Sequence, residues 1–116
     1  MGDSRAKSDL VPRVVLRPKA REDLVEIWEY IADESTLDRA DDYLRRLAHT
    51  LQYLAAHPHM GRSRPELDER VRSFPFESHL IFHVPLERQP ENGVELVRVI
   101  HASRDLESTW RDVEGQ

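Results

Sequence analysis

Hydrophobic residues recur with helical spacing in the first half of the chain. The first group stands at i, i+3, i+4 and i+7, which is one face of a helix: Leu24, Ile27, Trp28 and Ile31. This pattern predicts a helix from about Pro18 to Asp33, and Pro18 suits a first helical position because its φ is already fixed. Four carboxylates are expected on the other, solvated faces of this helix: Glu22, Asp23, Glu26 and Glu29.

A second apolar stripe follows after a short break. It predicts a helix from about Leu37 to His57, and its members are Ala40, Tyr43, Leu44, Leu47, Leu51 and Leu54. Ser35 or Thr36 is the candidate N-cap, and Pro58 ends the helix. Because the connection between the two helices is short, they are expected to be antiparallel neighbours. Their shared apolar face needs a sheet to cover it.

The rest of the chain is rich in β-branched and aromatic residues. Four strands are predicted in all: Val11–Leu16, Val71–Phe76, His79–Leu86 and Val94–His101. Asn92-Gly93 is a turn signal before the last strand, and the charged segment His59–Glu69 is predicted to be a loop. A short final helix is expected over Asp105–Trp110.

These elements predict an α+β fold, in which an N-terminal strand precedes an antiparallel helical hairpin packed on an antiparallel β-sheet. Residues 1–10 are polar and without period, so they are expected to form a flexible leader. Residues 11–116 are expected to form a single domain, since 116 residues suffice for one modest core.

Composition narrows the functional classes. The formal net charge of −5 disfavours tight, nonspecific binding to nucleic acid. The chain has no cysteine, which excludes disulfides and thiolate chemistry. No apolar run approaches the roughly 20 residues needed to span a bilayer, and the N-terminal segment lacks the apolar region of a secretory signal. A cytoplasmic protein that does not contact membranes is therefore expected.

The histidines and glycines do not indicate a metal or cofactor. His79 and His83 are four residues apart, but in a strand that spacing separates them by roughly 13 Å, too far to share an ion. With only four glycines, no loop that would cradle a phosphate is present. No Gly-x-Ser-x-Gly nucleophile motif occurs either. We expect no cofactor and no metal.

Basic residues gather around the predicted strands. On the last strand, Arg98 and His101 should point to opposite faces unless a bulge intervenes, which weakens a catalytic pairing of the two. Surface charges that only confer solubility are one interpretation of this cluster, and a macromolecular contact surface is the other. The candidate partner-binding residues are Arg72, His79, Arg98, His101, Arg104 and Trp110.

The order of these segments matches a known family over nearly the whole domain. The matching motifs are Leu16-Arg17-Pro18-Lys19-Ala20, Asp23-Leu24-x-Glu26-Ile27-Trp28-x-Tyr30-Ile31, His57-Pro58-x-x-Gly61, Glu66-Leu67, Val71-Arg72-Ser73-Phe74, His79-Leu80-Ile81-Phe82-His83-Val84 and Val97-Arg98-Val99-Ile100-His101. From about Val14 to Arg104 the chain resembles the ParE toxins of type II toxin–antitoxin modules, within the ParE/RelE superfamily.

The resemblance implies a toxin that inhibits DNA gyrase by trapping its complex with cleaved DNA, without being an enzyme itself. It also implies a ParD-like antitoxin that neutralises the toxin, and no sequence-specific binding to nucleic acid. The RelE branch of the superfamily instead cuts messenger RNA on the ribosome. For that alternative the candidate catalytic residues are His101, Arg72 and His79, although His79 stands where those nucleases often place an arginine. A non-toxic interaction module of the same fold is the third alternative.

Overall fold

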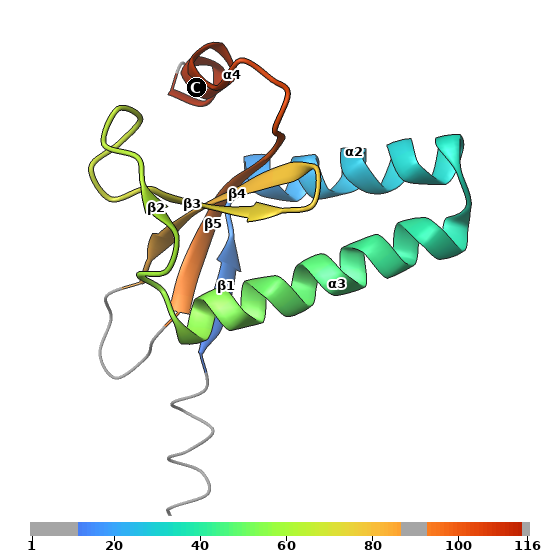
Figure 1. Cartoon of the computed structure of the whole chain (residues 1–116), viewed down its shortest axis with the longest axis horizontal. Coiled ribbons are helices and arrows are strands. Elements are labelled where there is room, and N and C mark those ends of the chain that lie inside the picture. The colour runs from blue at the N-terminus through green and yellow to red at the C-terminus, as the bar shows by residue number, and fades with distance from the viewer. Residues whose placement is uncertain (1–11, 87–92, 115–116) are drawn as a thin grey trace, which may run out of the picture.

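The computed structural model of the chain describes residues 12–86 and 93–114 (Figure 1). Its elements, in chain order, are β1 (Arg13–Leu16), α2 (Pro18–Glu34), α3 (Leu37–Ala56), β2 (Arg62–Ser63), β3 (Arg72–Phe76), β4 (His79–Pro85), β5 (Gly93–His101) and α4 (Leu106–Glu114). The predicted helices and strands are confirmed to within a few residues. Strand β2, however, lies in the segment that was predicted to be a loop. The predicted leader at residues 1–10 and Asn92 of the predicted turn lie outside the described residues.

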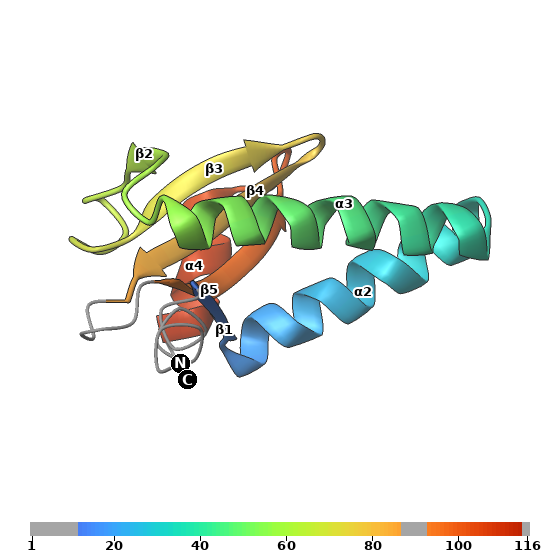
Figure 2. The same ribbon diagram turned by 90° about the horizontal axis from the view of Figure 1, so that it is seen from below.

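The helical hairpin forms where its local signals predict. Pro18 occupies the first turn of α2, and the Thr36 side chain caps α3 by accepting a hydrogen bond from the Arg39 backbone N–H at 3.1 Å. Helices α2 and α3 run antiparallel and cover one face of the sheet (Figure 2). Figure 1 shows the far end of the hairpin reaching beyond the sheet. Among the described residues, no helix combines the length and the apolar character needed to cross a bilayer.

The five strands form one sheet in the order β1-β5-β4-β3-β2. Strands β2 to β5 pair antiparallel, as predicted. Strand β1 differs, because it pairs with β5 in parallel, from Arg13 opposite Gly93 to Leu16 opposite Leu96. Two parallel neighbours need a long connection. The whole hairpin and the strands β2 to β4 supply that connection between β1 and β5.

Each face of the sheet carries a hydrophobic core. The helical hairpin and the strands enclose one core, whose centre includes Leu47, Leu54 and Ile81. On the opposite face a second, smaller core forms around Phe82, and Trp110 of α4 packs there with 5.7 Å between the ring centroids. Trp110 is only 6% exposed. Trp110, a candidate partner-binding residue, is therefore buried within this chain, where α4 covers part of the second apolar face of the sheet. Its role in binding a partner stays a prediction.

A bulge in β5 sets the direction of its side chains. Phe82 pairs with Arg98 and the next residue, His83, pairs with Leu96, so the register skips Val97 and β5 contains one extra residue. The simple alternation of faces assumed from the sequence fails between Leu96 and Arg98, whereas the register from Arg98 to His101 is regular. No bulge separates Arg98 from His101, and yet both side chains line the same groove.

Candidate functional site

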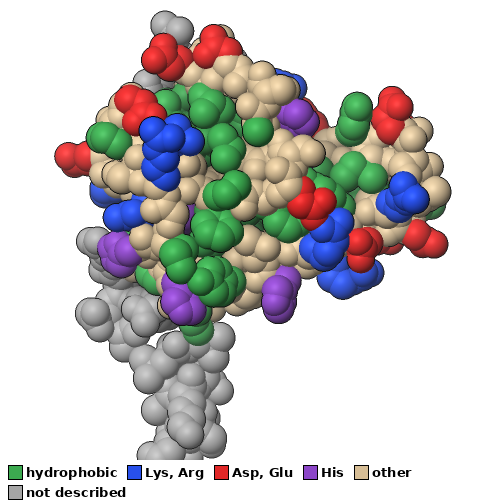
Figure 3. All heavy atoms as spheres, in the orientation of Figure 1, with side chains coloured by type: hydrophobic (Ala, Val, Ile, Leu, Met, Phe, Trp, Pro, Cys, Tyr) green, Lys and Arg blue, Asp and Glu red, His purple; other side chains and the backbone are tan. Residues whose placement is uncertain are grey.

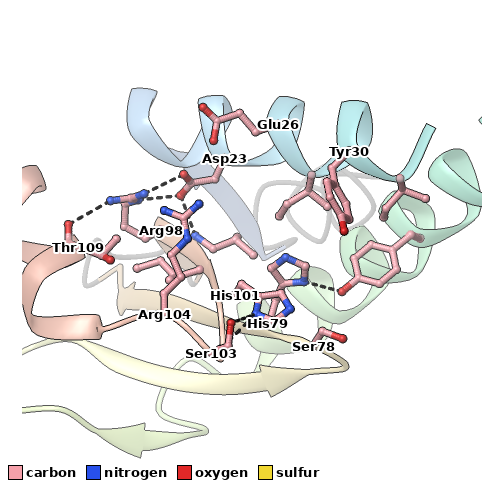
Figure 4. Close-up of a pocket in the computed structure, with 15 residues that line it drawn as sticks. Asp23, Glu26, Tyr30, Ser78, His79, Arg98, His101, Ser103, Arg104 and Thr109 are labelled. Carbon is pink, nitrogen blue, oxygen red and sulfur yellow. Dashed lines mark hydrogen bonds and ion pairs between the residues drawn. The ribbon is translucent and has the colours of Figure 1, made fainter. Parts of the chain in front are cut away.

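A groove of about 550 Å³ lies beside the ends of β4 and β5 (Figure 4). Helix α2 forms one wall, Tyr43 of α3 closes one end, and the loop after β5 and Thr109 of α4 form the remainder. The groove combines polar side chains with apolar ones such as Ile27 and Ile100. This composition is typical of a ligand site.

A buried ion pair forms one end of the groove. Arg98 Nε donates to Asp23 Oδ2 at 2.7 Å and Nη2 donates to Oδ1 at 3.0 Å. The Val99 backbone N–H donates to Oδ2 at 2.9 Å. Asp23 and Arg98 are 5% and 6% exposed, so the bidentate pair is shielded from water.

One prediction is wrong here, and one candidate contact residue is buried. Asp23 does not lie on a solvated face of its helix, because it is three residues after Ala20 and four before Ile27, both of which are buried. Arg98, a candidate partner-binding residue, is 6% exposed in this chain, and its role in binding a partner stays a prediction. Its charge is matched by Asp23, and its Nη1 also lies 3.5 Å from the Thr109 carbonyl oxygen.

His79 forms a hydrogen bond with Tyr43 of α3. The Tyr43 hydroxyl and His79 Nδ1 are 2.7 Å apart. Burial is the main cause that lowers the pKa of His79, and the neighbouring His101 lowers it further. Burial also raises the pKa of Tyr43. Both shifts favour the neutral forms of the two side chains, in which the Tyr43 hydroxyl donates a hydrogen bond to the imidazole.

His101 stands next to His79, with 5.3 Å between the ring centroids in an edge-to-face arrangement. Its Nδ1 receives the backbone N–H of Ser103 at 3.1 Å and lies 2.7 Å from the Ser103 hydroxyl. A backbone N–H can only donate, so Nδ1 is the acceptor and the proton of the neutral ring is on Nε2. The ring therefore faces the groove with a donor.

Arg104 reaches into the same groove from the loop after β5. Figure 4 shows its side chain directed toward the pair formed by Asp23 and Arg98. Among the described residues, the Arg104 side chain has no hydrogen bond or ion pair, and the residue is exposed. Of the predicted candidates, the groove thus brings together His79, Arg98, His101 and Arg104.

Arg72 lies elsewhere. It pairs with His83 at the other end of β4, four residues from His79, which is roughly 13 Å along the strand. Its guanidinium donates to the Gly61 carbonyl oxygen at 3.0 Å and so holds the loop that follows α3. The alternative catalytic set of Arg72, His79 and His101 is therefore not assembled, because only its two histidines are neighbours.

His83 is also structural. It is fully buried, and its Nε2 contacts the Met60 carbonyl oxygen at 3.1 Å. Burial lowers its pKa. Within the described ranges, no group of three histidine or acidic side chains is placed to hold a metal ion. Residues that the sequence analysis did not associate with function complete the groove: Glu26, Tyr30, Tyr43, Ser78 and Ser103.

Charges of both signs are interspersed on the face seen in Figure 3, and basic side chains do not gather into one broad patch there. A strong electrostatic surface for nucleic acid would require such a patch. This face therefore lacks the main feature of a nonspecific nucleic-acid binder.

Comparison with known proteins found relatives in sequence and in structure. A family model described as the ParE toxin of the type II toxin–antitoxin system, parDE, matches residues 14–106. Toxin ParE1 of Mycobacterium tuberculosis is 34% identical over 95 residues, which cover 82% of this chain and 94% of the relative. Toxin ParE1 of Caulobacter vibrioides is 34% identical over 88 residues, which cover 76% of this chain and 86% of the relative.

A solved structure titled "Chromosomal ParDE TA system from P. aeruginosa" has a TM-score of 0.63 to this chain, at 16% sequence identity. The match covers 78% of this chain and 96% of the chain in that structure. At this identity the likeness establishes a common fold.

Proposed function

The chain belongs to the ParE toxin family of type II toxin–antitoxin systems, and from this premise we propose that it inhibits DNA gyrase by trapping the complex of gyrase with cleaved DNA. In this proposal the toxin acts by shape and charge complementarity to its target. It performs no chemical step of its own.

The observation that carries the proposal is the orientation of His101. A ribonuclease of the related RelE type needs a base that takes the proton of the 2′-OH group. His101 is the acid–base candidate, but Ser103 occupies its lone-pair nitrogen with both a backbone N–H and a hydroxyl. Since the ring presents a donor to the groove, it is poorly placed to act as that base.

The two arginines with fixed contacts support the same conclusion. Arg72 holds the Gly61 carbonyl oxygen, and Arg98 is neutralised by Asp23. Both are engaged by the fold and are not available to stabilise the charge that develops on a cleaved phosphate. A protein contact that uses the exposed surface requires no such assembled site.

A ParD-like antitoxin completes the proposed system in the cytoplasm. The relative of known structure is titled as a ParDE system. In this chain, large apolar side chains stay exposed along the helical hairpin: Tyr30 is 68% exposed, Leu37 62% and Val25 53%. An antitoxin segment that buried this surface would stabilise the toxin by mass action. The purified toxin should therefore aggregate readily by itself, and its melting temperature should rise when the antitoxin encoded beside it is added.

The experiment that tests the target uses purified toxin in two parallel assays. One measures DNA supercoiling by gyrase together with the accumulation of cleaved DNA, and the other measures messenger RNA cleavage on translating ribosomes. We expect inhibition with cleaved DNA in the first and no cleavage in the second. Cleavage on ribosomes with unaffected gyrase would refute the proposal in favour of the ribonuclease. No effect in either assay would indicate a non-toxic interaction module.

A further inference from the structure

The groove presents several hydrogen-bond donors at one place. Ser103 fixes the neutral His101 ring with its proton on Nε2. We assign the Tyr43 hydroxyl as the donor to His79 Nδ1, 2.7 Å away, and this assignment places the His79 proton on Nε2 as well. Figure 4 shows the two rings in the groove close to each other, with Tyr30 above them on α2. This tautomer opposes metal binding, because a protonated Nε2 has no lone pair to offer an ion.

Arg104 adds a cation to these donors. The carboxylate nearest to it in the groove, Asp23, already carries the matching charge for Arg98. The side chain of Arg104 has no ion pair among the described residues. A guanidinium is a planar fork of N–H groups that fits the oxygens of a phosphate. Glu26 on the opposite wall is the competing negative charge, so a modest affinity is expected.

The remaining walls suit a flat ring. Tyr30 is 68% exposed, so its ring is available for contact, and Ile27, Ile31 and Ile100 give the groove an apolar lining. Bases of any sequence stack on exposed aromatic side chains. A volume of about 550 Å³ lies in the range of small-molecule sites.

We propose that this groove binds a nucleotide, with the phosphate held by Arg104, His79 and His101 and the base packed against Tyr30. The ligand is either a free nucleoside monophosphate or one nucleotide of a single strand, since both offer the same base and phosphate. A simple carboxylate would use the donors but leave Tyr30 without a contact. This inference stands apart from gyrase inhibition, because the groove could bind a nucleotide whichever target the toxin has.

The test is a titration of the purified full chain, followed by calorimetry and by the imidazole NMR signals of His79 and His101. The probes are adenosine and guanosine 5′-monophosphate, the parent nucleosides, inorganic phosphate and a short single-stranded oligonucleotide. We expect the monophosphates to bind and to shift both imidazole signals. The nucleosides and inorganic phosphate should each bind at least about 10-fold more weakly, because each lacks one half of the recognised group.

Two matched substitutions test the assignment of the phosphate contact. Arg104→Met should weaken monophosphate binding by about 10-fold or more, as expected for the loss of a charged hydrogen-bond donor. Arg70→Met, which removes an equally exposed guanidinium from the loop before β3, should leave the affinity unchanged. Tyr30→Ala should reduce the preference for monophosphates over inorganic phosphate. Circular dichroism checks that each variant is folded.

Several results would overturn the proposal. One is the absence of binding and of imidazole shifts at millimolar monophosphate and with the oligonucleotide. Another is an equal loss of affinity in Arg104→Met and Arg70→Met, which would indicate nonspecific charge attraction. Binding of the oligonucleotide that exceeds that of monophosphates, with the same dependence on Arg104, would support the site and assign its ligand to a strand. Gyrase inhibition is measured separately, so the two proposals can fail independently.

Discussion

Replacing Asp23 by alanine should remove a large part of the stability of the fold. Its carboxylate accepts three hydrogen bonds, two from the Arg98 guanidinium and one from the Val99 backbone N–H. The substitution leaves a guanidinium that is 6% exposed without its counter-charge, and it also leaves a backbone donor without an acceptor. Breaking a buried pair from one side costs about 3–5 kcal/mol, out of a total of about 5–15 kcal/mol for a typical domain.

Urea unfolding measures this loss of stability. The m-value, which is the slope of the unfolding free energy against urea concentration, should stay unchanged if the substitution alters only the stability. A matched control is Glu22→Ala on the same helix. This carboxylate pairs with Lys19 at 3.7 Å and is 62% exposed, so its loss should cost less than about 1 kcal/mol. The double variant Asp23→Leu with Arg98→Met should be more stable than the sum of the two single changes predicts, because no buried charge remains unpaired. The expected effect is contradicted if Asp23→Ala lowers the unfolding free energy by less than about 1 kcal/mol. It is also contradicted if the effects of Asp23→Leu and Arg98→Met simply add up in the double variant.

Three further predictions concern other parts of the fold. Gly61→Ala should destabilise the chain by about 1–3 kcal/mol in urea unfolding, since φ is +99° there and a Cβ would lie 2.6 Å from the Ser73 carbonyl oxygen; an unchanged midpoint would contradict it. Burial holds the pKa of His83 below 6.5, so the unfolded chain binds the proton first, and stability should fall as pH drops from about 6.5 toward the folded pKa; His83→Gln should flatten this dependence, and an identical pH profile for the variant would exclude His83 as the cause. Tyr43→Phe should cost about 0.5–1.5 kcal/mol and shift the imidazole NMR signals of His79, because the hydroxyl at 2.7 Å is lost; unshifted signals would show that this hydrogen bond is absent in solution.

The elements of the fold could be predicted because their signals are local. The apolar stripe of α3, its Thr36 cap and Pro58 after its end all act within a few residues of the helix. The parallel pairing of β1 with β5 could not be predicted in this way. It depends on which edge of the sheet is vacant after the other strands have paired, and the hydrophobic pattern of a short strand carries no such information.

The site was predicted only in part, for two physical reasons. A helical wheel assigns a residue to a face, but the partner of Asp23 lies 75 residues away in the sequence, so local spacing does not reveal it. Period-two counting places Arg98 and His101 on opposite faces, and it does not reveal that both side chains line one groove although no bulge separates them. One signal was present: Arg98 stands within an apolar run whose residues are buried on both faces, and a charge in such a place needs a buried partner.

We propose that this toxin binds its target and performs no chemical step, and the His101→Ala variant tests this proposal most directly. The measurement is the amount of cleaved DNA that purified gyrase accumulates with the wild-type toxin, with His101→Ala and with Arg104→Glu. We predict that His101→Ala accumulates nearly as much cleaved DNA as the wild type, since no proton transfer depends on the ring. Arg104→Glu should accumulate less if this exposed cation contacts the target. Loss of a general acid or base would instead cost about 10²–10⁴-fold in rate. If wild-type toxin leaves gyrase unaffected but cleaves messages on ribosomes, and His101→Ala abolishes that cleavage, the account is contradicted.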